Sequence, residues 1–143
     1  MINVRPVAYG TAAFEDCMTI RFEVFVTEQN VPPEEELDEF DKTATHLLAL
    51  FNNQPVGTAR AIEKSPGIWK IGRVAVRAPY RQLGIGEVLM QAIEAACPAR
   101  QWTLSAQTHA LKFYEKRGYV VEGPEFMEAG IPHRFMVKPG SVS

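Results

Sequence analysis

The sequence predicts a protein of the α/β class, an α+β mixture in which helices flank a twisted mixed sheet. Two observations carry this prediction: helix-like spacing of apolar residues recurs in three segments, and strand-like runs rich in Val, Ile and Leu lie between them. With 143 residues, 46% of them apolar and 22% charged, the chain has the size and composition of an ordinary globular domain. We therefore expect a single domain over residues 1–143.

The first part of the chain is expected to form a helix followed by a β-hairpin. Apolar residues spaced three to four apart predict a helix over residues 14–28, and the prolines of residues 30–36 end it. Strand-like runs at 46–51 and 55–62 flank Asn52-Asn53, a pair that favours a hairpin turn. The remaining elements are expected in this order: a strand at 69–76, a helix from Gly84 to Cys97, a strand at 102–107, a helix over 108–117 that ends at Gly118, strands at 119–121 and 134–137, and a loose tail at 139–143.

The strand at 69–76 contains a break in its alternation. Large apolar residues fall on odd positions as far as Ile71 and on even positions from Val74, so the pattern slips at Gly72-Arg73. One extra residue in the ladder, a β-bulge, explains the slip, because a bulge kinks its strand and disrupts pairing with the neighbour. The alternative is an edge defect that has no part in a site.

The segment after this strand has the features of an anion-binding helix start. Proline and two glycines, Gly84 and Gly86, separate the strand from an amphipathic helix. The first N–H groups of a helix have no helical partner and lie at the positive end of its dipole, so they favour an anion such as a pyrophosphate. The alternative is a tight turn only. The P-loop pattern is absent, and the dinucleotide fingerprint fails because Leu89 occupies the place of its third glycine.

The pattern R-x-x-G-x-G, formed by Arg81, Gly84 and Gly86, resembles the acyl-CoA-binding motif Q/R-x-x-G-x-G/A of the GNAT N-acetyltransferases. Matches at residues 24–32, 106–108, 113–119 and 130–133 extend the resemblance over nearly the whole chain, to the small ElaA-like branch of that family. The resemblance implies the GNAT acyl-CoA N-acyltransferase fold, in which a bulged central strand splays from its neighbour to admit the pantetheine arm. It also implies acetyl-CoA as cosubstrate, and these CoA-binding residues: Val74, Ala75, Val76, Arg81, Gln82, Leu83, Gly84, Ile85, Gly86, Gln107, Phe113 and Tyr114.

Acyl transfer from a thioester to an amine requires two proton transfers. The amine must lose a proton before it can attack, and the departing thiolate must gain one. Tyr114 matches the tyrosine that many GNAT enzymes place near the acetyl-CoA sulfur, so the resemblance assigns it the role of general acid. The alternative is a core aromatic that packs beside Phe113.

The general base is left open by the sequence. Glu28 and His46 are the first candidates, and Asp38, Asp41 and His133 are further ones, because the resemblance places their segments on the acceptor side. Each has a structural alternative: a carboxylate can cap or pair at a helix end, and a lone histidine can be a satisfied structural residue. A chain of water molecules is a further alternative.

Charge and composition limit the partners that we expect. A net charge of −2 and the absence of a leader or a bilayer-spanning run predict a cytoplasmic protein that binds neither nucleic acid nor membrane. Cys17 and Cys97 fall in helical patterns without metal-ligand spacing, so they are expected to be packing residues, and no metal is expected. Exposed sheet edges would allow a homodimer.

The acceptor is expected to be a small-molecule or peptide amine. A cationic amine is favoured, since seven acidic residues are concentrated in residues 28–41; the alternative is a solvated acidic loop. The acidic residues are Glu28, Glu34, Glu35, Glu36, Asp38, Glu39 and Asp41. The predicted function is thus transfer of an acetyl group from acetyl-CoA to a primary amine by direct attack in a ternary complex. The rival functions are an inactive acyl-CoA-binding sensor and a nucleotide-binding domain.

Overall fold

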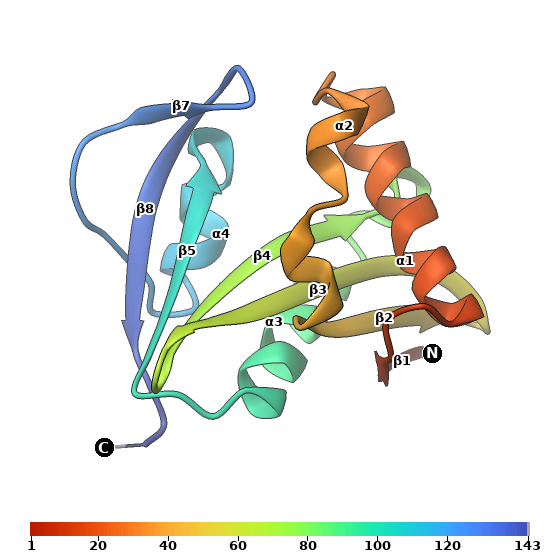
Figure 1. Cartoon of the computed structure of the whole chain (residues 1–143), viewed down its shortest axis with the longest axis horizontal. Coiled ribbons are helices and arrows are strands. Elements are labelled where there is room, and N and C mark those ends of the chain that lie inside the picture. The colour runs from red at the N-terminus through yellow and green to blue at the C-terminus, as the bar shows by residue number, and fades with distance from the viewer. Residues whose placement is uncertain (143) are drawn as a thin grey trace.

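A computed structural model describes residues 1–142, which form one eight-stranded mixed sheet with helices packed against it (Figure 1). The strand order is β1-β2-β3-β4-β5-β8-β6, with β7 paired to β8 off this path. The strands are β1 (Ile2–Val7), β2 (Thr45–Phe51), β3 (Gln54–Ser65), β4 (Ile68–Val76), β5 (Gln101–Gln107), β6 (Val120–Val121), β7 (Phe126–Glu128) and β8 (Ile131–Pro139). The helical segments are α1 (Ala12–Arg21), η1 (Phe22–Glu28), α2 (Pro33–Glu36), η2 (Glu39–Lys42), η3 (Ala78–Tyr80), α3 (Ile85–Ala96), η4 (Thr108–Ala110) and α4 (Leu111–Glu115).

Helices cover both faces of this sheet, which confirms the predicted mixed α/β class. α1 packs on β2, β3 and β4, and its buried residues Cys17 and Ile20 form one apolar cluster with Leu48 and Leu50. α3 packs on the opposite face, where Leu89 and Ile93 belong to a larger cluster that also receives α4. No helix within residues 1–142 is long and apolar enough to cross a membrane.

Most of the predicted elements are present. The helix predicted over 14–28 is α1 followed without a break by the π-helical turn η1, which ends at Glu28. The hairpin turn at Asn52-Asn53 is confirmed, and both residues have positive φ, at 50° and 67°. Cys17 and Cys97 are free and buried in the two apolar clusters, as expected of packing residues.

Two strands and the C-terminal segment were not anticipated. The sequence reasoning assigned no element to β1, which pairs with β2 over all its length, or to β7. The expectation of a loose tail over 139–143 was wrong for residues 139–142. Pro139 ends β8, Gly140 N–H donates to the Arg100 carbonyl at 2.8 Å, and Val142 N–H donates to the Ala99 carbonyl at 3.0 Å. Ser143 lies outside the described residues.

The bulge in β4 lies where the alternation predicts it. Thr58 faces Ala75 and Arg60 faces Gly72, so β4 has one extra residue between these two pairs. Arg73 occupies the extra place with φ at 50°, a conformation that side chains with a Cβ rarely adopt. β4 pairs with β5 in parallel only from Ile68 to Lys70, and beyond Lys70 the two strands separate. The sheet therefore opens between β4 and β5 next to the bulge, as Figure 1 shows.

Candidate active site

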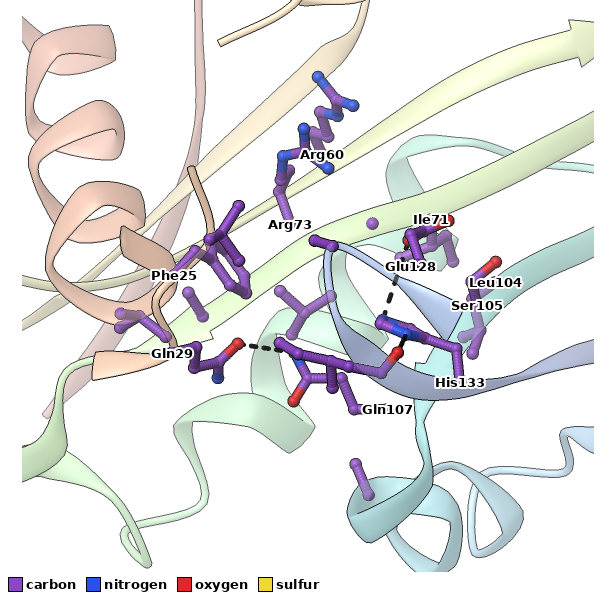
Figure 2. A pocket seen from close by; sticks show the side chains of 18 of the residues that line it. Phe25, Gln29, Arg60, Ile71, Arg73, Leu104, Ser105, Gln107, Glu128 and His133 are labelled. Atoms are coloured by element: carbon purple, nitrogen blue, oxygen red, sulfur yellow. Dashed lines mark hydrogen bonds and ion pairs between the residues drawn. The ribbon is translucent and has the colours of Figure 1, made fainter. Parts of the chain in front are cut away.

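A cavity of about 580 Å³ occupies the opening between β4 and β5. It is lined by the bulged part of β4, by the ends of β5 and β8, and by side chains from η1, α2 and η2 (Figure 2). Tyr114, from the α3 side of the sheet, and His133, from β8, both line it. Of the residues expected to bind CoA, Val74, Ala75, Val76, Arg81, Gln107 and Tyr114 line this cavity.

A row of free backbone donors lies at the start of α3. None of the N–H groups of residues 82–87 donates a hydrogen bond within the described part of the chain. Gln82 and Gly84 have φ of +70° and +82°, and such left-handed residues in a turn direct successive N–H groups to one side as an anion-binding nest. Glu87 would repel an anion here, but Arg117 pairs with its carboxylate. These donors, together with the helix dipole, suit a phosphate or pyrophosphate group.

Glycine at position 86 keeps the start of α3 close to α4. A Cβ at Gly86 would lie 3.2 Å from Phe113 Cζ, tighter than an ordinary contact. Phe113 thus packs against the nest, next to Tyr114, rather than lining the cavity itself. The Leu83 side chain is exposed to solvent, and the Ile85 side chain, at the start of α3, is buried in the core. The backbone N–H groups of both residues make no hydrogen bond within the described part of the chain.

Arg81 is fixed between the cavity and η1. Its Nε donates to the Val76 carbonyl at 2.8 Å, and its Nη2 contacts both carboxylate oxygens of Glu28 at 2.7 and 3.0 Å. Glu28 does not line the cavity. The structure therefore places Glu28 as the partner that orients Arg81, away from where an acceptor amine would bind.

His46 lies in the core beneath α1. It is 2% exposed, its Nε2 lies 2.8 Å from the Asp41 carbonyl oxygen, and its ring contacts the Phe14 ring edge-on at 4.9 Å. Burial lowers the pKa of His46, which keeps the ring neutral. Because His46 does not line the cavity, it cannot reach an acceptor bound there, and we remove it from the base candidates.

The acidic segment is partly neutralised by arginines. Arg21, 1% exposed, donates to Glu36 at 2.8 Å and to Asp41 at 2.7 Å. Arg60 binds Asp41 at 2.9 Å and Asp38 through both terminal nitrogens, at 2.7 and 2.8 Å. The expected concentration of negative charge is thus reduced but not removed, since four of the seven carboxylates pair with arginines. Glu28 pairs with Arg81, and the other three belong to what we call the arginine network: Arg21, Arg60, Arg73, Glu36, Asp38 and Asp41.

The same pairing removes Asp38 and Asp41 from the base candidates. Desolvation opposes ionisation of Asp41, but hydrogen bonds from Arg21 and from the Asp38 N–H outweigh it and lower its pKa to about 2. Desolvation likewise opposes ionisation of Asp38, and Arg60 outweighs it, so the pKa of Asp38 is also lowered. A carboxylate held ionised by two arginines is a poor acceptor for the proton of an amine.

His133 is positioned to accept a proton in the cavity. It is 6% exposed, and its Nδ1 lies 2.7 Å from the Ile131 carbonyl oxygen. A carbonyl only accepts, so Nδ1 carries the hydrogen of the neutral ring and leaves Nε2 with its lone pair. Nε2 lies 3.8 Å from a Glu128 carboxylate oxygen, and Phe126 stacks on the ring. Figure 2 shows His133 beside Glu128 among the side chains that line the cavity.

Tyr114 keeps a hydroxyl without a partner. Its ring packs edge-on against Phe113 at 4.9 Å and Tyr119 at 6.1 Å, while its oxygen makes no hydrogen bond within residues 1–142. Burial raises the pKa of Tyr114 to about 12. The side chain therefore stays protonated at neutral pH and can donate to an acceptor atom that enters the cavity.

Gln107 links the two sides of the opening. Its Nε2 donates to Gln29 Oε1 at 2.7 Å, and its Oε1 lies 2.7 Å from His109 Nε2. Both polar atoms are thus engaged, which connects β5 to the residue that follows η1. The sequence did not reveal the arginine network, nor Glu128, Lys64 and Lys70 of the cavity lining, because these residues come from separate elements and follow no local pattern.

Comparison with known proteins identifies the family. Residues 11–139 match the model of the acetyltransferase (GNAT) domain. The chain belongs to the GNAT acetyltransferase family. It is 40% identical to the uncharacterized N-acetyltransferase YjcF of Bacillus subtilis over 92% of this chain and 96% of that one. The crystal structure of Escherichia coli ElaA superposes with a TM-score of 0.85 at 28% identity, covering 96% of this chain and 99% of ElaA.

The predicted family, fold and enzyme class are confirmed by these matches: the protein is a GNAT acetyltransferase. An aminoglycoside 6′-N-acetyltransferase solved with coenzyme A shares the fold, with a TM-score of 0.75 at 18% identity over 96% of each chain. At this identity the likeness extends to the fold alone.

Proposed function

We propose that this GNAT acetyltransferase moves an acetyl group from acetyl-CoA to a primary amine by direct attack in a ternary complex. The observation that carries the proposal is the nest of free N–H groups at residues 82–87, which follows β4, the strand beside the opening, after the short helix η3. The nest together with the opening between β4 and β5 suits a ligand that carries both a pyrophosphate and a thioester arm. One cavity then holds both substrates.

The described residues fit acetyl-CoA. The N–H groups of residues 82–87 would hold its pyrophosphate, and the opening at Val74 and Val76 would take the pantetheine arm. Bound acetyl-CoA supplies an activated acetyl group with a thiolate leaving group. An N–H of the bulged strand would be available to polarise the thioester carbonyl.

Tyr114 and His133 serve the two proton transfers. His133 Nε2 accepts the proton that the amine loses as its nitrogen forms the bond to the acetyl carbon. The Tyr114 hydroxyl donates a proton to the sulfur as the carbon–sulfur bond breaks. A lysine-like amine has a pKa of about 10.4, so at pH 7 only about one in a thousand is neutral, and a base beside it has a clear use.

The test combines binding with transfer. Calorimetry should show that the protein binds acetyl-CoA, and a panel of primary amines should release free thiol and form N-acetyl product. His133→Ala should lower kcat/KM at pH 7 by about 10²-fold while acetyl-CoA affinity stays the same. Binding of acetyl-CoA without transfer to any amine would instead favour the sensor function, and a full rate in His133→Ala would remove His133 from the mechanism.

A further inference from the structure

The charges of the cavity are divided between its two ends. Glu36 and Asp38 line it but belong to the arginine network, so they leave no net negative charge on that wall. The lining residues outside the network then determine which charges an acceptor meets. These are Glu35, Lys64, Lys70, Arg81, His109, Glu128 and His133.

Two lysines form the end of the cavity where β4 and β5 are still paired. Lys70 lies on β4 opposite Ile62 and next to Thr103, and Lys64 follows two residues after Ile62. Lys64 Nζ lies 4.8 Å from the centre of the Phe40 ring. Neither lysine forms an ion pair with a carboxylate of residues 1–142, so this end has two available ammonium groups.

The opposite end carries carboxylates. Glu128 lies beside His133, and Glu35 lies beside the bulge, where Arg73 donates to its carbonyl at 3.2 Å. Both glutamates are exposed and outside the arginine network. The glutamate carboxylates therefore attract an ammonium group to the end of the cavity next to the proposed base. The two lysines attract an anion to the other end.

The strand register gives the distance between the two ends. Lys70 is level with Thr103 on β5, and His133 is level with Gln107, four residues further along the same strand. At about 3.3 Å per residue this separation is about 13 Å along the strands. Lys70 and His133 also lie two strands apart, on either side of β5, which adds about 10 Å sideways and brings the backbone separation to about 16 Å. Because lysine side chains extend part of the way, an acceptor that bridges the ends is on the order of 10 Å long.

We propose that the acceptor is an elongated zwitterion, a short peptide whose amino terminus is acetylated at His133 while its carboxylate binds Lys64 and Lys70. This proposal rests on the proposed function, because it concerns the acceptor half of the same cavity. An extended tripeptide is about 10 Å long, which matches the estimated separation. A single amino acid is too short to bridge the two ends, and a polyamine would place an ammonium group against the lysines.

The test compares triglycine with triglycinamide, which differ only in the terminal carboxylate. Affinity is measured by calorimetry with coenzyme A present, and kcat/KM is measured with acetyl-CoA. We expect triglycine to bind about tenfold more tightly than its amide, because charge-assisted hydrogen bonds are the stronger ones. In a Lys64→Gln/Lys70→Gln double variant the ratio should fall to about one. Lys42→Gln, an exposed lysine of η2 outside the cavity lining, is the matched control and should keep the ratio.

The outcomes separate this inference from the proposed function. Equal or weaker binding of triglycine, no binding of either peptide, or a ratio that survives in the double variant would overturn the inference. Acetylation of triglycinamide without preference would support the acetyltransferase function and reject the zwitterion. Preferred binding of triglycine without acetyl transfer would support the lysine subsite and contradict the proposed function.

Discussion

Tyr114→Phe removes the proposed acid and little else. The Tyr114 hydroxyl has no hydrogen-bond partner within the described residues, so no folded-state bond is lost with it. The phenylalanine ring keeps the contacts with Phe113 at 4.9 Å and with Tyr119 at 6.1 Å. We therefore expect the free energy of unfolding to change by less than about 1 kcal/mol.

The expected loss of rate follows from the position of the hydroxyl. A positioned general acid contributes about 10²- to 10⁴-fold. The pKa of Tyr114 is raised to about 12, whereas a free thiol has a pKa of about 8.5, so complete transfer of the proton is uphill. This difference favours the lower end of the range, and we expect kcat to fall by about 10²-fold, or about 3 kcal/mol of barrier. The raised pKa also means that Tyr114 remains protonated up to about pH 11, so its ionisation should cause no loss of rate below that pH.

The measurement is kcat with saturating acetyl-CoA, together with acetyl-CoA affinity by calorimetry. Tyr119→Phe is the matched control, because it removes the same group from a buried tyrosine that does not line the cavity. The Tyr119 hydroxyl donates to Glu94 at 2.8 Å. The control should lose about 1–2 kcal/mol of stability and keep its kcat. If Tyr114→Phe keeps kcat within threefold of the wild type, Tyr114 is a packing residue and the sulfur receives its proton elsewhere.

Two further predictions concern the nest and the arginine network. Gly86→Asp should lower coenzyme A affinity by at least about 10²-fold, since it adds a carboxylate beside the nest and crowds the Phe113 ring. The control is Gln91→Asp, which adds the same charge at an exposed position of the same helix and should keep the affinity. Equal losses of affinity in calorimetry would place the anion site elsewhere. Asp41→Asn should lower the free energy of unfolding by about 2–3 kcal/mol, because it removes one of the two carboxylates that pair with the buried Arg21 and leaves only Glu36; an unchanged urea midpoint would contradict this. Folding lowers the pKa of Asp41 from 3.8 to about 2, so the ionised carboxylate contributes about 2 kcal/mol to the free energy of unfolding. This contribution is present above pH 4 and is lost as the pH falls through about 2. Acid unfolding of the wild type and of Asp41→Asn would detect the difference.

The sequence predicts the features of this site that depend on neighbouring residues. A slip in alternation gives the bulge at Arg73, and two glycines before an amphipathic helix give the nest, since both follow from a few consecutive residues. β1 and β7 carry no such signal: β1 includes Pro6 and two polar residues, Asn3 and Arg5, and β7 is three residues long. Their pairing depends on strands elsewhere in the chain.

The base could not be chosen from the sequence because its choice depends on long-range pairing. Glu28 contacts Arg81, 53 residues away, and Asp41 contacts Arg21, 20 residues away. Each contact removes a candidate that has the right chemistry as an isolated side chain. His133 remains because the Ile131 carbonyl fixes its tautomer while no arginine or lysine pairs with it in the described chain.

Arg73 links the opening of the sheet to the wall of the cavity. A residue other than glycine in the left-handed region costs about 1–2 kcal/mol, so the bulge needs compensating contacts. Arg73 obtains them from the α2 segment, where its Nη2 donates to the Glu35 and Glu36 carbonyls at 3.2 and 3.0 Å and its Nε lies 2.9 Å from the Glu36 carboxylate. The residue at the β4 bulge, next to the opening between β4 and β5, therefore also holds the α2 wall of the cavity. Because one residue contributes to both features, the bulged part of β4 and the α2 wall, where we propose that the thioester and the acceptor bind, keep a fixed relative position.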